Sequence, residues 1–165
     1  IAGFEYDDEH GIVKDPLLGG RVLVLSERLF AEMRVLLSES MSRPAVDTLL
    51  WHMGNKYGLA LGRRTKKMAK TRGEAVELLA NAAQRSGWGK ITISDGFETT
   101  GKMVVVFENC VFCEGLISEK TSACSFLSGI LAGIAESLYD KGVSIQEELC
   151  RAAGGGVCRF NIQTV

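Results

Sequence analysis

One stretch of the chain, residues 120–139, would be apolar around most of its circumference as a helix. Large apolar side chains recur there at helical spacing: Phe126, Leu127, Ile130, Leu131, Ile134 and Leu138. Small residues fill the gaps between them: Ser128, Gly129, Ala132 and Gly133. A helix without a polar face is stable only when other elements cover it on most sides. The sequence therefore predicts a core packed around this helix.

The segments around that helix predict an α+β fold. Several stretches before residue 90 have apolar residues at helical spacing. Residues 91–107 change to a period of two, which predicts an antiparallel hairpin, and residues 143–162 predict a second one. We expect one domain over residues 1–165, with an antiparallel sheet of about four strands packed against several α-helices. Residues 1–20 are expected to be an irregular lead-in.

A stripe of glycines marks the helix that precedes the basic part of the chain. Gly54, Gly58 and Gly62 recur at every fourth position. Glycine inside a helix costs about 1 kcal/mol relative to alanine, so three in register suggest that another backbone comes close. That backbone belongs either to the same chain or to a second subunit, and the stripe leaves both open. We carry a homodimer forward as an expectation.

Charge and composition narrow the class of protein. The 165 residues carry a formal net charge of −1, so nucleic acid is not an expected partner. The basic run over residues 63–72 is interpreted as a solvated helix end, because no aromatic residue interleaves its charges. The longest apolar run is far shorter than the about 20 residues of a membrane span. Five cysteines, an odd number in a chain that needs no disulfides, favour the cytoplasm.

Three of the cysteines have a spacing that suits a metal site. Cys150 and Cys158 flank a hairpin turn with three consecutive glycines, so they can face each other across two strands. Cys124 lies near the start of the apolar helix, and Glu147 shortly precedes Cys150. Three thiolates and a carboxylate can hold zinc tetrahedrally. From spacing alone, simple buried thiols explain these cysteines as well.

Cys110-Val111-Phe112-Cys113 is a second cysteine motif. A CxxC pair can be a redox couple or half of a zinc site. The apolar flanks and Phe112 favour a third interpretation, in which Cys110 and Cys113 are buried thiols.

The chain from Cys124 onward resembles the C-terminal signature of the vinyl-4-reductase domain family, related to the fold of TRAPP vesicle-tethering subunits and haem-type nitric-oxide sensors. The matching positions are Cys124, the segment from Glu147 to Gly154, and the triplet from Cys158 to Phe160. The resemblance is specific over residues 103–163, the expected metal-binding core, and diffuse upstream. Gly155 departs from the pattern, because that position is often acidic.

The resemblance implies a zinc held by Cys124, Glu147, Cys150 and Cys158. Such a set leaves no open position, so the zinc would be structural. Residues three apart on a flat strand face opposite sides, so plain geometry favours Glu148 over Glu147 as the partner of Cys150. A β-bulge near Leu149 would bring Glu147 round instead. We expect Glu147 to be the ligand.

The resemblance also implies a small-molecule-binding or sensing domain, since the same domain forms the sensory half of phenol- and xylene-responsive activators. We expect a largely apolar pocket for an apolar or aromatic molecule. Its expected lining, with His52 as polar anchor, is Trp51, His52, Met53, Trp88, Met103, Val105, Phe126 and Ile130. The alternatives are an accessory or carrier protein for tetrapyrrole vinyl reduction, or a dimeric scaffold resembling TRAPP subunits. No catalytic residues or dinucleotide motif are recognised in the sequence, so an enzyme is not the favoured interpretation.

Overall fold

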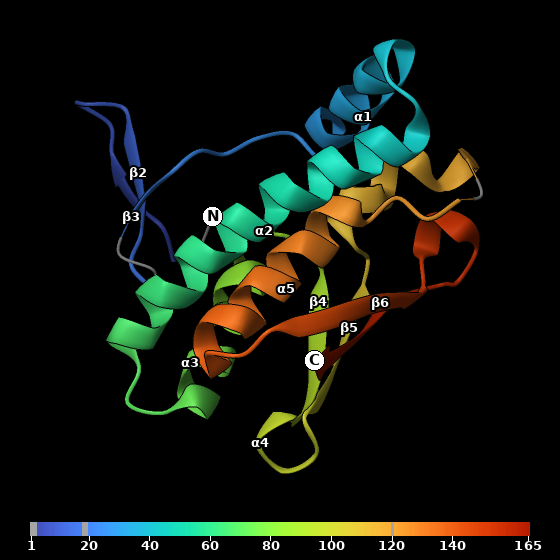
Figure 1. The fold of residues 1–165 in the computed structure, drawn as a ribbon. Coiled ribbons are helices and arrows are strands. Elements are labelled where there is room, and N and C mark those ends of the chain that lie inside the picture. The colour runs from blue at the N-terminus through green and yellow to red at the C-terminus, as the bar shows by residue number, and fades with distance from the viewer. Residues whose placement is uncertain (1–2, 18–19, 120) are drawn as a thin grey trace.

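The computed structural model describes residues 3–17, 20–119 and 121–165 (Figure 1). It confirms the α+β class. Four strands form an antiparallel sheet in the order β4-β5-β7-β6. These strands are β4 (Lys90–Gly96), β5 (Lys102–Glu108), β6 (Val143–Leu149) and β7 (Cys158–Thr164). The helices are α1 (Arg28–Ser40), α2 (Arg43–Met68), α3 (Arg72–Arg85), α4 (Phe97–Thr100) and α5 (Ser125–Tyr139).

One face of the sheet is built from alternating apolar residues of its two central strands. Met103, Val105 and Phe107 of β5 are buried and pair in register with alternate residues of β7. Val105 lies opposite Phe160, and Phe107 lies opposite Cys158. Because neighbouring strands keep the same alternation, Cys158 enters the core on the same face as the aromatic rings.

The glycine stripe packs inside the chain. Helices α2 and α5 run side by side over the sheet (Figure 1), with their backbones in close contact. A Cβ atom at Gly58 would lie 2.1 Å from the Ile130 carbonyl oxygen, and one at Gly54 would lie 2.0 Å from the Phe126 oxygen. Gly129 of α5 makes the reciprocal approach to the Trp51 oxygen of α2. The stripe therefore gives no support to a homodimer.

The first residues are more regular than expected. Instead of an irregular lead-in, β1 (Glu5–Asp7), β2 (Ile12–Asp15) and β3 (Gly20–Val22) form a small antiparallel sheet in that order. These strands are short and mostly solvent-exposed, so they carry too little apolar alternation to be recognised in the sequence. Gly11, at a φ of +62°, turns the first hairpin, a conformation that glycine adopts without strain.

Two further segments differ from their predicted form. The apolar helix begins at Ser125 rather than residue 120, which leaves Cys124 at its N-cap position. The ambiguous stretch after β5 forms a 3₁₀ helix, η1 (Val111–Glu119), and a second short one, η2 (Arg151–Ala153), follows β6. Within the described ranges, no helix combines the length and apolarity that crossing a membrane requires.

Candidate functional site

All five cysteines of the chain meet at one buried place. Each comes from a different local structure: Cys110 from the turn after β5, Cys113 from η1, Cys124 from the start of α5, Cys150 from the end of the β6 segment and Cys158 from the first position of β7. Four of them have no solvent exposure, and Cys150 is 4% exposed. All five are free thiols. We call these five residues the thiol cluster.

The sulfur spacing suits a tetrahedral metal ion. The Sγ of Cys158 lies 3.6 Å from the Sγ of Cys124 and 3.6 Å from that of Cys113. The Sγ of Cys124 lies 3.9 Å from those of Cys110 and Cys150. Zinc–sulfur bonds of about 2.3 Å place tetrahedral ligands about 3.8 Å apart, whereas a disulfide needs about 2.05 Å. The residues present therefore fit a metal ion.

Two sets of four ligands overlap in the cluster. Their ligand atoms lie within 4.8 Å of one another in each set: Cys110, Cys113, Cys124 and Cys158 in one, and Cys124, Glu147, Cys150 and Cys158 in the other. The second is the set that the sequence resemblance implies. The first includes the CxxC pair, which we had interpreted as buried thiols only, because chain spacing did not show that η1 folds back onto β7.

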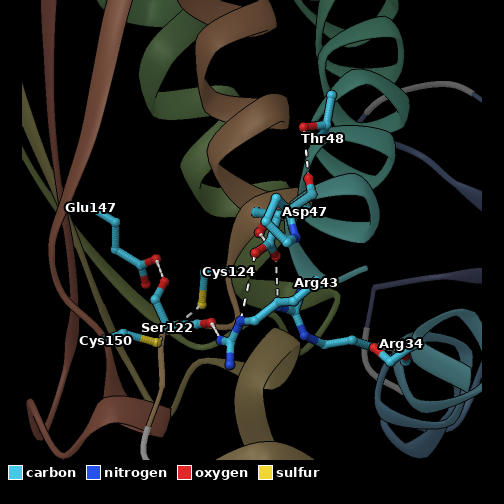
Figure 2. A network of polar contacts seen from close by, with 11 residues as sticks. Arg34, Arg43, Asp47, Thr48, Ser122, Cys124, Glu147 and Cys150 are labelled. Atoms are coloured by element: carbon cyan, nitrogen blue, oxygen red, sulfur yellow. Dashed lines mark hydrogen bonds and ion pairs between the residues drawn. The ribbon is translucent and has the colours of Figure 1, made fainter. Parts of the chain in front are cut away.

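A strand irregularity brings Glu147 rather than Glu148 to the cluster. The pairing of β6 with β7 shifts register between Glu147 and Leu149, as the β-bulge interpretation expects. Glu147 is half-buried, and its Oε2 accepts a hydrogen bond from the Ser122 hydroxyl (Figure 2). Its Oε1 is buried without a hydrogen-bond partner among the described residues. Glu148 points elsewhere and accepts a bond of 2.9 Å from Arg159 Nε.

The thiols and Glu147 have strongly shifted pKa values. Hydrogen bonds to neighbouring thiols, that of Cys110 first, lower the pKa of Cys113 and raise the pKa of Cys124. Thiol donors and thiolate acceptors are therefore stabilised side by side. Burial is the main cause that raises the pKa of Glu147 to about 8. A buried group of this kind binds a cation in preference to remaining ionised alone.

The hairpin turn holds two of the sulfurs in place. The backbone N–H groups of Ala153 and Gly155 both donate to the Cys150 carbonyl oxygen, at 3.0 and 2.8 Å. Gly154 has a φ of +91°, which closes η2 in a left-handed conformation. The Arg151 N–H points at the Cys158 Sγ at 3.4 Å, and its guanidinium pairs with Glu114 of η1. The turn and η1 are thus fastened together around the sulfurs.

A polar network joins the cluster to helices α1 and α2 (Figure 2). Asp47 of α2 accepts bonds of 2.6 Å from Arg34 Nη2 and from the Ser125 hydroxyl. Ser125 directly follows Cys124, and Arg43 donates to the Ser122 carbonyl oxygen at 2.7 Å. The segment that positions Cys124 is therefore held by charged groups of two other helices.

An apolar cavity of about 640 Å³ lies on the other side of η1. Four of the eight expected pocket residues line it: Trp88, Met103, Val105 and Phe126. Trp51, His52, Met53 and Ile130 do not. The approach of α2 to α5 explains the difference: Ile130 lies fully buried at the α2 contact, and the His52 and Met53 side chains are exposed.

Phe112 joins the cluster to this cavity. Its ring lies 5.0 Å from that of Phe30, 5.1 Å from Trp88 and 5.9 Å from Phe126, measured between centroids, and all four line the cavity. The sequence analysis placed Phe112 in a buried motif but not in the pocket wall. Helix α3 also contributes a wall that we did not expect, including Leu79 and Ala83, although its helical apolar spacing is visible in the sequence.

Comparisons with known proteins agree with the C-terminal resemblance. Residues 103–164 match the model of the vinyl-4-reductase domain. An uncharacterised protein of Methanocaldococcus jannaschii is 38% identical over 63 residues, which are 38% of this chain and 34% of that protein. A second uncharacterised protein of the same organism is 20% identical over 118 residues, 72% of this chain and 65% of its own length. The chain thus spans less than two thirds of either relative.

Three solved structures share the fold. The phenol-responsive sensory domain of the transcription activator PoxR, with phenol, superposes with a TM-score of 0.82 at 15% identity, covering 98% of this chain and 85% of that one. A trafficking protein particle complex subunit 3 from Naegleria fowleri, covalently bound to palmitic acid, gives 0.64 at 14%, covering 84% and 92%. A vinyl-4-reductase family protein from M. jannaschii gives 0.61 at 16%, covering 87% and 84%. With the buried cysteines and the β6–β7 hairpin inside the matched residues, the chain carries a vinyl-4-reductase domain at residues 103–164.

Proposed function

We propose that this chain is a sensing domain that binds a small apolar or aromatic molecule in the cavity between α3, α5 and the sheet. The cavity itself carries the proposal. Protein interiors are close-packed and rarely keep voids larger than a water molecule. A volume of about 640 Å³ lies in the range of small-molecule sites. Its lining is dominated by apolar and aromatic side chains, so an apolar ligand would replace little bound water.

The related structures support the ligand class. The PoxR sensory domain holds phenol, and the Naegleria subunit holds palmitic acid. Both molecules are mostly apolar and carry one polar end. In this chain the cavity is bordered by a few polar residues, among them Asp15, Arg21 and Tyr57, where such an end can be bound. Burial raises the pKa of Tyr57, so its hydroxyl stays a hydrogen-bond donor.

We further propose that zinc occupies the thiol cluster in a structural role. Thiolate ligands favour zinc, and a closed set of four protein ligands leaves no position for a substrate. Cys124 and Cys158 belong to both possible sets, so they are its common ligands. The zinc would bind η1 and α5 to the hairpin and so stabilise one wall of the cavity. Buried free thiols suit a reducing compartment such as the cytoplasm.

A thermal-shift screen with phenols, fatty acids and tetrapyrroles tests the sensing function. Saturation at about a hundred times the dissociation constant stabilises the folded state by about 2.7 kcal/mol. We expect at least one class to raise the melting temperature by about 5 °C or more. Ala83→Phe places a ring in the cavity and should abolish the shift, while Asn81→Phe, on the exposed side of α3, should keep it.

The scaffold and carrier interpretations differ in that screen. A carrier for tetrapyrrole reduction responds to tetrapyrroles alone. If every compound leaves the melting temperature of the native protein unchanged, the sensing function is wrong, and a scaffold role takes its place.

A further inference from the structure

The thiol cluster holds more donor atoms than one tetrahedral ion can use. Five sulfurs and the Glu147 carboxylate compete for four positions, and only Cys124 and Cys158 belong to both sets. The remaining two positions fall either to Glu147 and Cys150 or to Cys110 and Cys113. The pair decides which segments of the chain the metal joins.

We propose that the ion is held by four thiolates, those of Cys110, Cys113, Cys124 and Cys158. The inference rests on the metal part of the proposed function. The Sγ separations of Cys113–Cys158, Cys124–Cys158 and Cys110–Cys124 are 3.6, 3.6 and 3.9 Å. They match three edges of a zinc–thiolate tetrahedron, for which about 3.8 Å is expected. Zinc, a borderline-soft ion, favours thiolate over carboxylate.

The backbone between β5 and η1 is shaped to present both sulfurs of the CxxC motif. Asn109 has a φ of +56°, a left-handed conformation that turns the chain sharply after β5. The Val111 N–H then donates to the Trp88 carbonyl oxygen at 3.1 Å, which fixes the turn. Cys113 contacts the Cys110 carbonyl oxygen at 3.5 Å, so the two cysteines lie on one turn of η1. Both side chains point to the same buried spot.

Burial also separates the two pairs. Cys110 and Cys113 have no solvent exposure, whereas Cys150 is 4% exposed and Glu147 is half-buried. Glu147 already accepts a hydrogen bond from Ser122 through Oε2. Its buried and unpartnered Oε1 is the feature that favours the competing set. The proposal assigns Glu147 and Cys150 to the surroundings of the ion rather than to its ligands.

The four-thiolate set has a consequence that the competing set lacks. Val111 and Phe112, which lie between Cys110 and Cys113, line the apolar cavity. A metal bound to this pair therefore holds the cavity wall directly. A metal bound to Glu147 and Cys150 would hold the hairpin and α5 but leave η1 to its own packing.

X-ray absorption on the zinc-loaded native protein tests the ligand set. We expect four sulfurs at about 2.3 Å and no oxygen. In chelator competition, Cys113→Ser should weaken zinc binding at least about tenfold, while Glu147→Gln should change it less than about twofold. The sulfur count of the native protein decides the question even if the Cys113 variant does not fold.

Each opposing result has a distinct meaning. Three sulfurs and one oxygen, with affinity lost in Glu147→Gln and kept in Cys113→Ser, overturn the inference and leave the structural zinc standing. A protein that binds no zinc overturns both the inference and the metal part of the proposed function. The ligand screen on the cavity is independent of either outcome.

Discussion

At the scale of single residues, Asp47 connects the helices to the thiol cluster. Its carboxylate accepts bonds of 2.6 Å from Arg34 and from Ser125, the residue after Cys124. The Arg34 side chain is only 5% exposed, and its Nη1 has no partner among the residues described. A buried guanidinium depends on its remaining charge partner, because an unpaired buried charge is unfavourable.

We predict that Asp47→Asn lowers the free energy of unfolding by about 2–3 kcal/mol, below the about 3–5 kcal/mol of a fully buried pair, since the Asp47 side chain is 34% exposed. Chemical denaturation measures the difference. Arg43→Gln is the matched control: Arg43 Nε lies 3.8 Å from Asp47 and is 44% exposed, so its loss should cost less than about 1 kcal/mol. Equal losses in both variants would contradict the special role of the Arg34 pair.

At the scale of elements, the contact between α2 and α5 depends on glycine. The axes come close enough that a Cβ atom at Gly58 would overlap the Ile130 backbone, 2.1 Å from its oxygen and 2.8 Å from its carbonyl carbon. The backbone of a packed helix cannot move aside as a flexible side chain can. Any side chain at this position must therefore separate two central helices.

We predict that Gly58→Leu destabilises the folded chain by more than about 3 kcal/mol, and that it does so without changing the oligomeric state. Thermal unfolding and light scattering together make the measurement. Gly73→Ala, in the first turn of α3, is the control, because its Cβ would meet only the Thr71 hydroxyl at 4.0 Å. That variant should be neutral or up to about 1 kcal/mol more stable. A folded Gly58→Leu chain of halved mass would restore the subunit-interface interpretation.

At the scale of the whole molecule, the thiol cluster and the cavity share a wall. Val111 and Phe112 of η1 face the cavity, while Cys110 and Cys113 on either side reach the cluster. Phe112 also packs against Phe30 of α1 and Phe126 of α5. Metal binding and ligand binding therefore act on one segment, which makes them thermodynamically coupled.

We predict that removing the metal with a chelator lowers the affinity of the cavity for its apolar ligand, since η1 then loses its anchor. The coupling should amount to about 1–3 kcal/mol, or roughly 5–150-fold. Titration of native protein before chelation, after chelation and after zinc is restored measures it. Cys158→Ser, which lacks a common ligand, should show no effect of chelator. Identical affinities with and without metal would show that the cluster supports the hairpin alone.

Local spacing determined much of this protein. The period-two runs predict the four-stranded sheet, and the apolar circumference of residues 125–139 predicts a buried helix, because side-chain periodicity follows directly from backbone geometry. The C-terminal motif identified the vinyl-4-reductase domain and the residue types of a metal set. The three N-terminal strands escaped prediction because strands so short and exposed carry little periodicity.

Only the tertiary structure decided which groups meet. The β-bulge after Glu147 determines which glutamate faces the cluster, and bulges depend on the paired strand rather than on local sequence. The partner of Gly58 is α5, far along the chain, a choice that spacing within α2 could not make. The CxxC cysteines reach the cluster because η1 folds back onto β7. In each case, contacts between distant segments set the outcome, and these form only when the chain buries its apolar surface as a whole.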